Sequence, residues 1–341
     1  MPHRSRKIKV ILATLKLLLA VGILIFLFLR IRSHAGFGRL ISEPKDWGSL
    51  AMAQVLILVG FSLSFVRWFL LVRGLELDFH LRDAFRLGSL GYMFNQVSPG
   101  SVGGDLLKAV FIAREQHGKR TEAVATVLID RAIGLYAMIL VASIGLAFAD
   151  EAAAASETFQ TIQTVVWSTA VVATLGIVWA MSPLAVGERV RSLADQVPVV
   201  GHTIHRLLDA TEVYRRRKRY LMAAFFIALV THYMVITGFW LISHGLPVYA
   251  PSFSENASIV PVGLVIGTLP LTPGGLGTLE AGLEFLFTTV GAEKGDGTLI
   301  ALVYRVMTYV LAAIGAGYYL SARKSVDRLI HDAEELAEEM E

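Results

Sequence analysis

Long apolar runs separated by short polar stretches dominate the hydrophobic pattern of this chain. A helix needs about 20 mostly apolar residues to cross a bilayer. Six runs reach this length and predict membrane-spanning helices at Val10–Leu29, Leu50–Val72, Ala123–Ala149, Thr161–Met181, Tyr220–His244 and Thr298–Ala322. The pattern therefore indicates an all-α, polytopic membrane protein that forms a single integral membrane domain over residues 1–341.

Two further apolar stretches are interrupted and cannot be continuous spans. Ala84–Ala113 is broken at residues 98–104, and Ala257–Val290 is broken at residues 272–277. Each break contains Pro, which lacks an N–H donor, and Gly, which tolerates positive φ, so each predicts a turn between two half-helices. We predict two re-entrant helical hairpins, the first entering from the cytoplasm and the second from the outer face.

The distribution of Lys and Arg predicts the orientation in the membrane. Basic residues precede the first span, crowd the loop 183–219 and begin the tail 323–341, whereas the loops 150–160 and 245–258 contain none. Cytoplasmic loops of membrane proteins carry an excess of Lys and Arg. Both termini, the loop 183–219 and the tail are therefore expected in the cytoplasm, although the basic loop 30–48 departs from this pattern.

Composition excludes several classes of protein. Hydrophobic residues make up 55% of the 341 residues and charged residues only 17%, against about 25% charged in a typical soluble domain. A soluble enzyme and a disordered chain are therefore ruled out. The chain has 0 Cys, which rules out a disulfide scaffold, a thiol nucleophile and a thiolate metal site.

The two broken stretches resemble each other. Residues 98–103 match residues 272–277, and an Arg follows the Pro of each by 32 residues, at Arg131 and Arg305. The match extends upstream, where residues 68–75 align with 239–246. We predict repeat units at about 50–149 and 220–322. Three crossings, an odd number, separate equivalent helices, so the two units should have opposite orientations in the membrane. Inverted repeats with discontinuous helices are typical of transporters, with the site where the broken segments meet.

A site for an anion is predicted at the breaks. The half-helices should restart near Asp105 and Thr278 and expose free N–H groups together with the positive end of the helix dipole. An Arg beside a wet cavity can bind a phosphate through two hydrogen bonds. The candidate substrate-binding residues are Arg131, Arg305, Lys108, Asn95, Pro99, Gly100, Gly103, Gly104, Pro273, Gly274, Gly275 and Gly277.

Structural roles are the alternative for these residues. Each break can be a tight turn and nothing more. Arg131 can pair with Asp130 or Asp105, and Arg305 with Glu280 or Glu284. Such pairs remain compatible with function, because an anionic ligand can open them.

Four acidic residues are candidates for coupling or gating, namely Asp105, Asp130, Glu280 and Glu284. Glu280 and Glu284 are four residues apart and therefore share one helix face, where two negative charges repel. Glu280 is accordingly a candidate proton carrier, and Asp105 can alternatively cap its half-helix.

Three other features of the spans enter the prediction. Arg67 either extends its charge to the cytoplasmic interface or belongs to the same path of basic residues as Arg131 and Lys108. His232 is expected to be packed and hydrogen-bonded. No Asp-rich motif or His-Glu-x-x-His sequence occurs, so no metal or cofactor is predicted.

Residues 95–108, the pair Asp130-Arg131 and the second Pro-Gly copy at 272–277 carry a family resemblance. Over about residues 8–325 the chain resembles the flippase-like membrane domain of lysylphosphatidylglycerol synthases and their stand-alone relatives. The resemblance implies lipid translocation in a bacterial or archaeal cytoplasmic (inner) membrane. Two-domain relatives also carry a soluble aminoacyl-transferase domain, for which this chain leaves no room, so synthase activity is not expected.

The favoured function is therefore a lipid flippase that moves an anionic phospholipid or a polyprenyl-phosphate-linked lipid between leaflets. The expected partners are membrane lipids and a separate lipid-modifying enzyme, with no nucleic acid. Replacing Arg131 or Arg305 by Ala should stop translocation without unfolding the protein. A secondary transporter of a small soluble anion is the main alternative, and a membrane-embedded enzyme acting on a lipid phosphate is less favoured.

Overall fold

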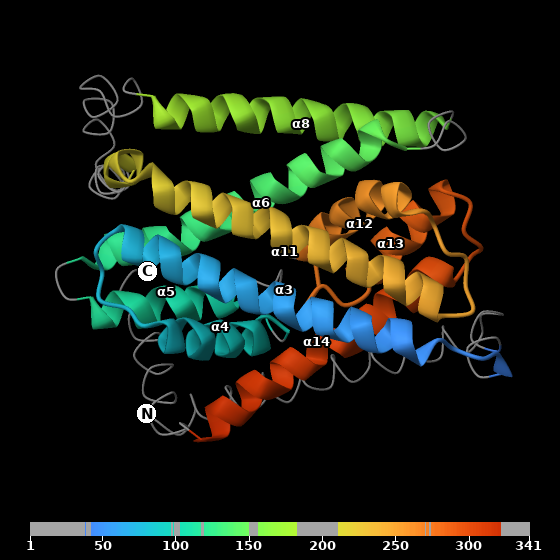
Figure 1. The fold of residues 1–341 in the computed structure, drawn as a ribbon, viewed down its shortest axis with the longest axis horizontal. Coiled ribbons are helices and arrows are strands. Elements are labelled where there is room, and N and C mark those ends of the chain that lie inside the picture. The colour runs from blue at the N-terminus through green and yellow to red at the C-terminus, as the bar shows by residue number, and fades with distance from the viewer. Residues whose placement is uncertain are drawn as a thin grey trace, which may run out of the picture.

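The described part of the chain is helical, and no strand occurs in it (Figure 1). The computed structural model describes residues 38, 42–96, 98, 103–116, 119–149, 156–182, 211–269, 271–272 and 274–321. The helices are α3 (Trp47–Gly74), α4 (Leu81–Asn95), α5 (Gly103–Glu115), α6 (Arg120–Ala147), α8 (Glu157–Met181), α11 (Lys218–Gly245), α12 (Phe253–Thr268), α13 (Thr278–Thr289) and α14 (Asp296–Ser321).

Five of these helices, α3, α6, α8, α11 and α14, are long and apolar enough to cross a membrane. They confirm five of the six predicted spans, with ends that differ from the prediction by a few residues. The first predicted span, Val10–Leu29, lies outside the described residues, as do most of the loop 183–219 and the tail 323–341.

Both interrupted stretches are pairs of short helices, as the sequence predicts. The first is α4 and α5, and the second is α12 and α13. α13 begins at Thr278 as predicted, whereas α5 begins at Gly103, two residues before the predicted start. In the second break Gly274, Gly275 and Gly277 have φ of 58°, 66° and 84°, a left-handed backbone that glycine adopts without steric cost. The membrane face from which each pair enters stays a prediction.

The helices α3 and α11 lie side by side through the centre of the molecule (Figure 1). The N–H of Asp46, before α3, donates to the carbonyl of Gly245 at the end of α11 (3.1 Å). Thr231 Oγ1 donates to the Gly60 carbonyl in the middle of the pair (3.4 Å). The residue numbers rise along one helix as they fall along the other, so α3 and α11 are antiparallel.

The two short pairs lie at opposite ends of this central pair, α4 and α5 at one end and α12 and α13 at the other (Figure 1). α4 packs on α14, and α12 packs on α6. Glycine makes both approaches close. A Cβ on Gly315 of α14 would lie 2.2 Å from the Ser89 carbonyl oxygen, and one on Gly145 of α6 would lie 2.4 Å from the Ala257 carbonyl carbon.

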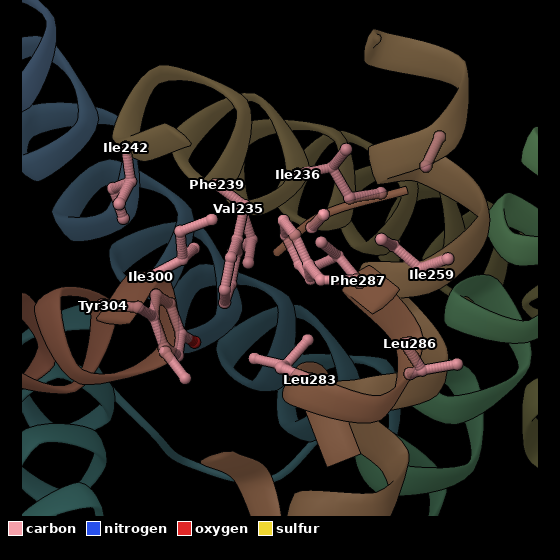
Figure 2. Packing of buried hydrophobic residues seen from close by; sticks show 14 of the residues in the cluster. Val235, Ile236, Phe239, Ile242, Ile259, Leu283, Leu286, Phe287, Ile300 and Tyr304 are labelled. Carbon is pink, nitrogen blue, oxygen red and sulfur yellow. The ribbon is translucent and has the colours of Figure 1, made fainter. Parts of the chain in front are cut away.

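Two apolar clusters hold the helices together. The larger joins mainly α3, α11, α12, α13 and α14, and Figure 2 shows Phe239 near its middle, with Tyr304 and Ile300 to the left. The ring centroids of Phe239 and Tyr304 are 4.4 Å apart. The smaller cluster joins α3, α4, α5 and α6 around the buried Trp68. It lies on the side of the molecule where the first set of buried charges is found.

Candidate functional site

A buried ion pair links α3 and α6. Arg67 Nε donates to Asp130 Oδ1 (2.7 Å) and Arg67 Nη2 donates to Asp130 Oδ2 (3.0 Å). The side chains are 8% and 11% exposed. Of the two alternatives for Arg67, extension of its charge to the interface is therefore wrong. This geometry satisfies both oxygens of the carboxylate with a matched pair of N–H donors.

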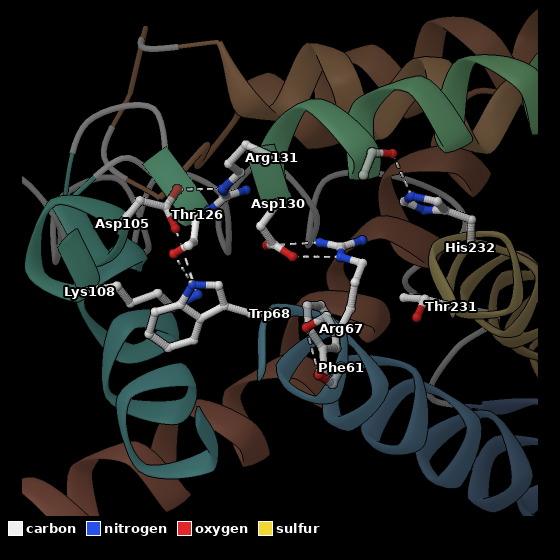
Figure 3. Close-up of polar contacts among 12 residues, drawn as sticks. Phe61, Arg67, Trp68, Asp105, Lys108, Thr126, Asp130, Arg131, Thr231 and His232 are labelled. Carbon is white, nitrogen blue, oxygen red and sulfur yellow. Dashed lines mark hydrogen bonds and ion pairs between the residues drawn. The ribbon is translucent and has the colours of Figure 1, made fainter. Parts of the chain in front are cut away.

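Next to this pair, Arg131 forms an ion pair with Asp105 of α5, so of its two predicted partners it is Asp105 that it contacts. Lys108 Nζ lies 3.7 Å from Asp105 Oδ1 and 5.4 Å from the centroid of the Trp68 ring. Figure 3 shows these side chains converging from α3, α5 and α6. The Arg131 side chain is 48% exposed, against 15% for Asp105 and 12% for Lys108.

The charges of this group, which we call the first-unit cluster, do not cancel. Arg67, Lys108 and Arg131 supply three positive charges, and Asp105 and Asp130 supply two negative charges. Ionisable groups within membrane helices are costly and mark ligand or ion pathways by default. A surplus of one positive charge favours an anion beside the half-exposed Arg131.

The second unit holds the equivalent Arg in a closed site. Arg305 Nε and Nη2 donate to the two oxygens of Glu280, the second contact at 3.1 Å. The Arg305 guanidinium also donates to the carbonyls of Gly274 and Gly275, at 2.9 Å each. The Arg305 and Glu280 side chains are only 6% and 3% exposed. Of the two predicted partners of Arg305, the structure selects Glu280.

The half-helix starts do not offer the free N–H groups expected from the sequence. The Gly103 N–H donates to Ser98 Oγ (2.9 Å), and the Gly104 N–H donates to Asn95 Oδ1 (2.7 Å). In the second unit the Gly277 N–H donates to Glu280 Oε2 (2.7 Å). The expectation is wrong at these three glycines because polar side chains of the same hairpin already accept their hydrogen bonds.

The two broken segments meet, as the sequence predicts. The Gly274 N–H of the second break donates to the Ser98 carbonyl of the first (2.9 Å). A Cβ on Gly274 would lie 2.4 Å from the Gln96 carbonyl oxygen, so only glycine permits this approach. Pro99, Gly100 and Pro273 lie outside the described residues.

Glu280 and Glu284 have separate partners. Glu284 accepts the N–H groups of Gly295 (2.6 Å) and Thr298 (2.9 Å), at the start of α14. Both oxygens of Glu280 accept N–H groups from Arg305, an arrangement suited to a carboxylate rather than to a protonated acid. Proton transfer through Glu280 stays a prediction, and it would require breaking this pair.

Comparison with protein families identifies the architecture. Residues 13–315 match the family described as the lysylphosphatidylglycerol synthase TM region. The chain belongs to this family. The match covers most of the chain and supports a multi-pass membrane protein with a role related to membrane lipids. A comparison with curated proteins gives no match at a significant level.

Within this lysylphosphatidylglycerol synthase TM fold, sequence reasoning missed the partnership of Arg67 with Asp130. The residues are 63 positions apart, and only the packing of α3 on α6 brings them together. The position of Arg67 inside an apolar span was the available signal. His232 is hydrogen-bonded to the Gly134 carbonyl (2.8 Å), which confirms its expected role. Among the described residues, no three His, Cys, Asp or Glu gather as they would around a metal ion.

Proposed function

We propose that this protein moves a lipid with an anionic head group between the leaflets of the membrane, and that Arg131 and Lys108 bind the head-group phosphate. Arg131 lies eleven residues into α6, about 16 Å along the helix axis. It is therefore deep within a helix long enough to span the bilayer. Phosphate accepts paired N–H donors from a guanidinium, which suits Arg131 to this role.

The observation that carries the proposal is the apolar surface around Arg131. Leu128 and Leu135 lie three and four residues away on the same face of α6, and they are 57% and 46% exposed. Leu106, next to Asp105, is 63% exposed. A half-exposed guanidinium thus opens onto a surface suited to acyl chains. This surface favours a lipid, whose tails remain in the bilayer, over a small soluble anion, which needs a polar path.

We also propose that the units are an inverted repeat that supports alternating access. The long helices α3 and α11 each have 28 residues and begin 171 positions apart. The contact between Gly60 and Thr231 joins positions that are also 171 apart. Equivalent positions facing each other on antiparallel helices are expected near a twofold axis in the membrane plane. Exchange of the two units' conformations would then alternate the side that is open.

The first test is a leaflet-resolved lipid transfer assay in proteoliposomes, with phosphatidylglycerol and a polyprenyl phosphate as separate probes. Arg131→Ala should reduce transfer to the level of protein-free vesicles, because the phosphate loses its donor. Arg131→Lys should retain part of the transfer, since Lys keeps the charge but not the two-donor geometry. Arg82→Ala, which removes an exposed charge at the start of α4, is the matched control and should transfer lipid normally.

The same vesicles distinguish the alternatives. Normal lipid transfer by folded Arg131→Ala protein would refute the proposed role of Arg131. Uptake of inorganic phosphate that requires Arg131, without lipid transfer, would establish the soluble-anion transporter instead. Chemical turnover of the lipid phosphate would point to an enzyme.

A further inference from the structure

A second polar site lies at the far end of α3, apart from the first-unit cluster. A cavity of about 380 Å³, wide open to the outside, lies between the last turn of α3, the connection to α4 and the start of α11. It is lined by Arg73, Glu76, Leu77, Asp78, Arg217 and Tyr220. None of these residues belongs to the first-unit cluster, and the volume lies within the range of small-molecule sites.

The walls of the cavity are held by buried contacts. The hydroxyl of the buried Tyr214, just before α11, donates to the Leu71 carbonyl (2.6 Å). Gln116 Nε2 donates to the Asp78 carbonyl and fixes the connection from the side of α5 (2.6 Å). Leu77 is 1% exposed and packs in the smaller apolar cluster. These contacts fix the main chain on two sides of the cavity.

One pair of charges on its wall is already neutralised. Glu76 has a left-handed backbone, with φ of 56°, which is uncommon for a residue with a side chain. It forms an ion pair with Arg217 at the start of α11. The hydrogen bond from Arg217 holds the pKa of Glu76 below its ordinary value, so both partners are charged at neutral pH.

The remaining charges on the wall have no such partners. Arg73 and Asp78 are both exposed, and neither side chain forms an ion pair or a hydrogen bond with any residue that the structure describes. They carry opposite charges and line one cavity, yet they are not paired with each other. A ligand that carries both charges would complete the two interactions together.

We propose that this cavity binds a zwitterionic phosphate ester, with the phosphate on Arg73 and the ammonium group on Asp78. Arg73 is in the last turn of a membrane-spanning helix, a position compatible with the depth of lipid head groups. The same chemistry occurs in phosphatidylethanolamine and in soluble glycerophosphoethanolamine. The assignment is independent of lipid transfer through Arg131, because it concerns binding alone.

The test compares lipid binding to the purified full-length protein by native mass spectrometry. The wild type should bind phosphatidylethanolamine at least tenfold more tightly than phosphatidylglycerol, which has the phosphate but no ammonium group. Asp78→Asn should abolish this preference, and Arg73→Gln should weaken binding of both lipids about tenfold. Arg82→Gln, an exposed charge outside the cavity, is the matched control and should behave as the wild type.

Soluble glycerophosphoethanolamine, added as a competitor, identifies the source of the ligand. Displacement of the lipid at similar concentrations would assign the cavity to a soluble ester, and no displacement would assign it to the lipid. A wild type without preference between the two lipids would overturn the proposal. Unchanged preference in Asp78→Asn together with unchanged affinity in Arg73→Gln would also overturn it.

Discussion

The two units place an Arg and an acid of the preceding short helix in nearly equivalent positions but enclose them differently. Arg131 pairs with Asp105 and keeps 48% of its side chain exposed, whereas Arg305 pairs with Glu280 and keeps only 6% exposed. Arg305 also binds two carbonyls of the break. The same sequence motif therefore leaves its Arg half-exposed in one unit and encloses it in the other, and the proposed binding of a phosphate rests on Arg131 alone.

The first unit has a second, buried ion pair beside the half-exposed Arg131. Arg67 and Asp130 join α3 to α6 in the protein interior. With the offsets of 171 and 174 residues between the units, the corresponding positions hold Gly238 and Tyr304, which cannot form an ion pair. Arg305 instead links α14 to Glu280 of α13 and to the carbonyls of Gly274 and Gly275.

The largest expected difference is in stability. Arg305→Ala should lower the free energy of unfolding by about 3–5 kcal/mol, because it leaves Glu280 buried without its partner. Arg131→Ala should cost less than about 1 kcal/mol, as expected for a partly exposed pair. Chemical denaturation of both variants in the same detergent measures the difference. For Arg305→Ala, the burial of its pair with Glu280 makes unfolding a larger risk than the sequence-based expectation, which held that neither replacement unfolds the protein.

A companion variant checks the cause. Glu280→Gln keeps the shape of the acid but removes its charge, so it should also be strongly destabilising, whereas Asp105→Asn should be mild. Equal losses of free energy of unfolding in Glu280→Gln and Asp105→Asn would contradict a more deeply buried ion pair in the second unit.

An intermediate effect is expected where each short pair packs on the other unit. Gly315→Ala should lower the free energy of unfolding by about 1–3 kcal/mol, because the new Cβ would overlap the Ser89 carbonyl and force α4 away from α14. Gly317→Ala, on the same helix with no atom within 4 Å of its Cβ position, is the matched control. Thermal unfolding of the two variants measures the effect, and equal midpoints would contradict close packing of α4 on α14.

The smallest effect concerns the starts of equivalent short helices. α12 begins with a capping box in which the Glu255 N–H donates to Ser252 Oγ, whereas His80, the residue before α4, makes no side-chain capping hydrogen bond. Ser252→Ala should cost about 1 kcal/mol, and His80→Ala should be close to neutral. Hydrogen exchange at the first turn of each helix compares them. If the two replacements change the exchange rates of their helices equally, relative to the wild type, the capping box does not stabilise α12 more than His80 stabilises α4.

The sequence predicts the spans and the breaks well because membrane helices require long apolar runs and because Pro and Gly interrupt them locally. It also limits the partners of Arg131 and Arg305 to two acids each. It does not predict which Arg is enclosed, since exposure depends on packing between distant helices. The sequence also does not predict the hydrogen bonds from Arg305 to the carbonyls of Gly274 and Gly275, because every residue has a backbone carbonyl and none is distinguished by its side chain.

The hydrogen bond between the Gly274 N–H and the Ser98 carbonyl joins the two breaks through main-chain atoms alone. No side-chain replacement at position 98 can delete either atom of this joint. Because Arg305 also donates to the Gly274 carbonyl, a single residue connects the first break to the buried pair of Arg305 and Glu280. The first break therefore cannot separate from the second without breaking a contact next to that pair.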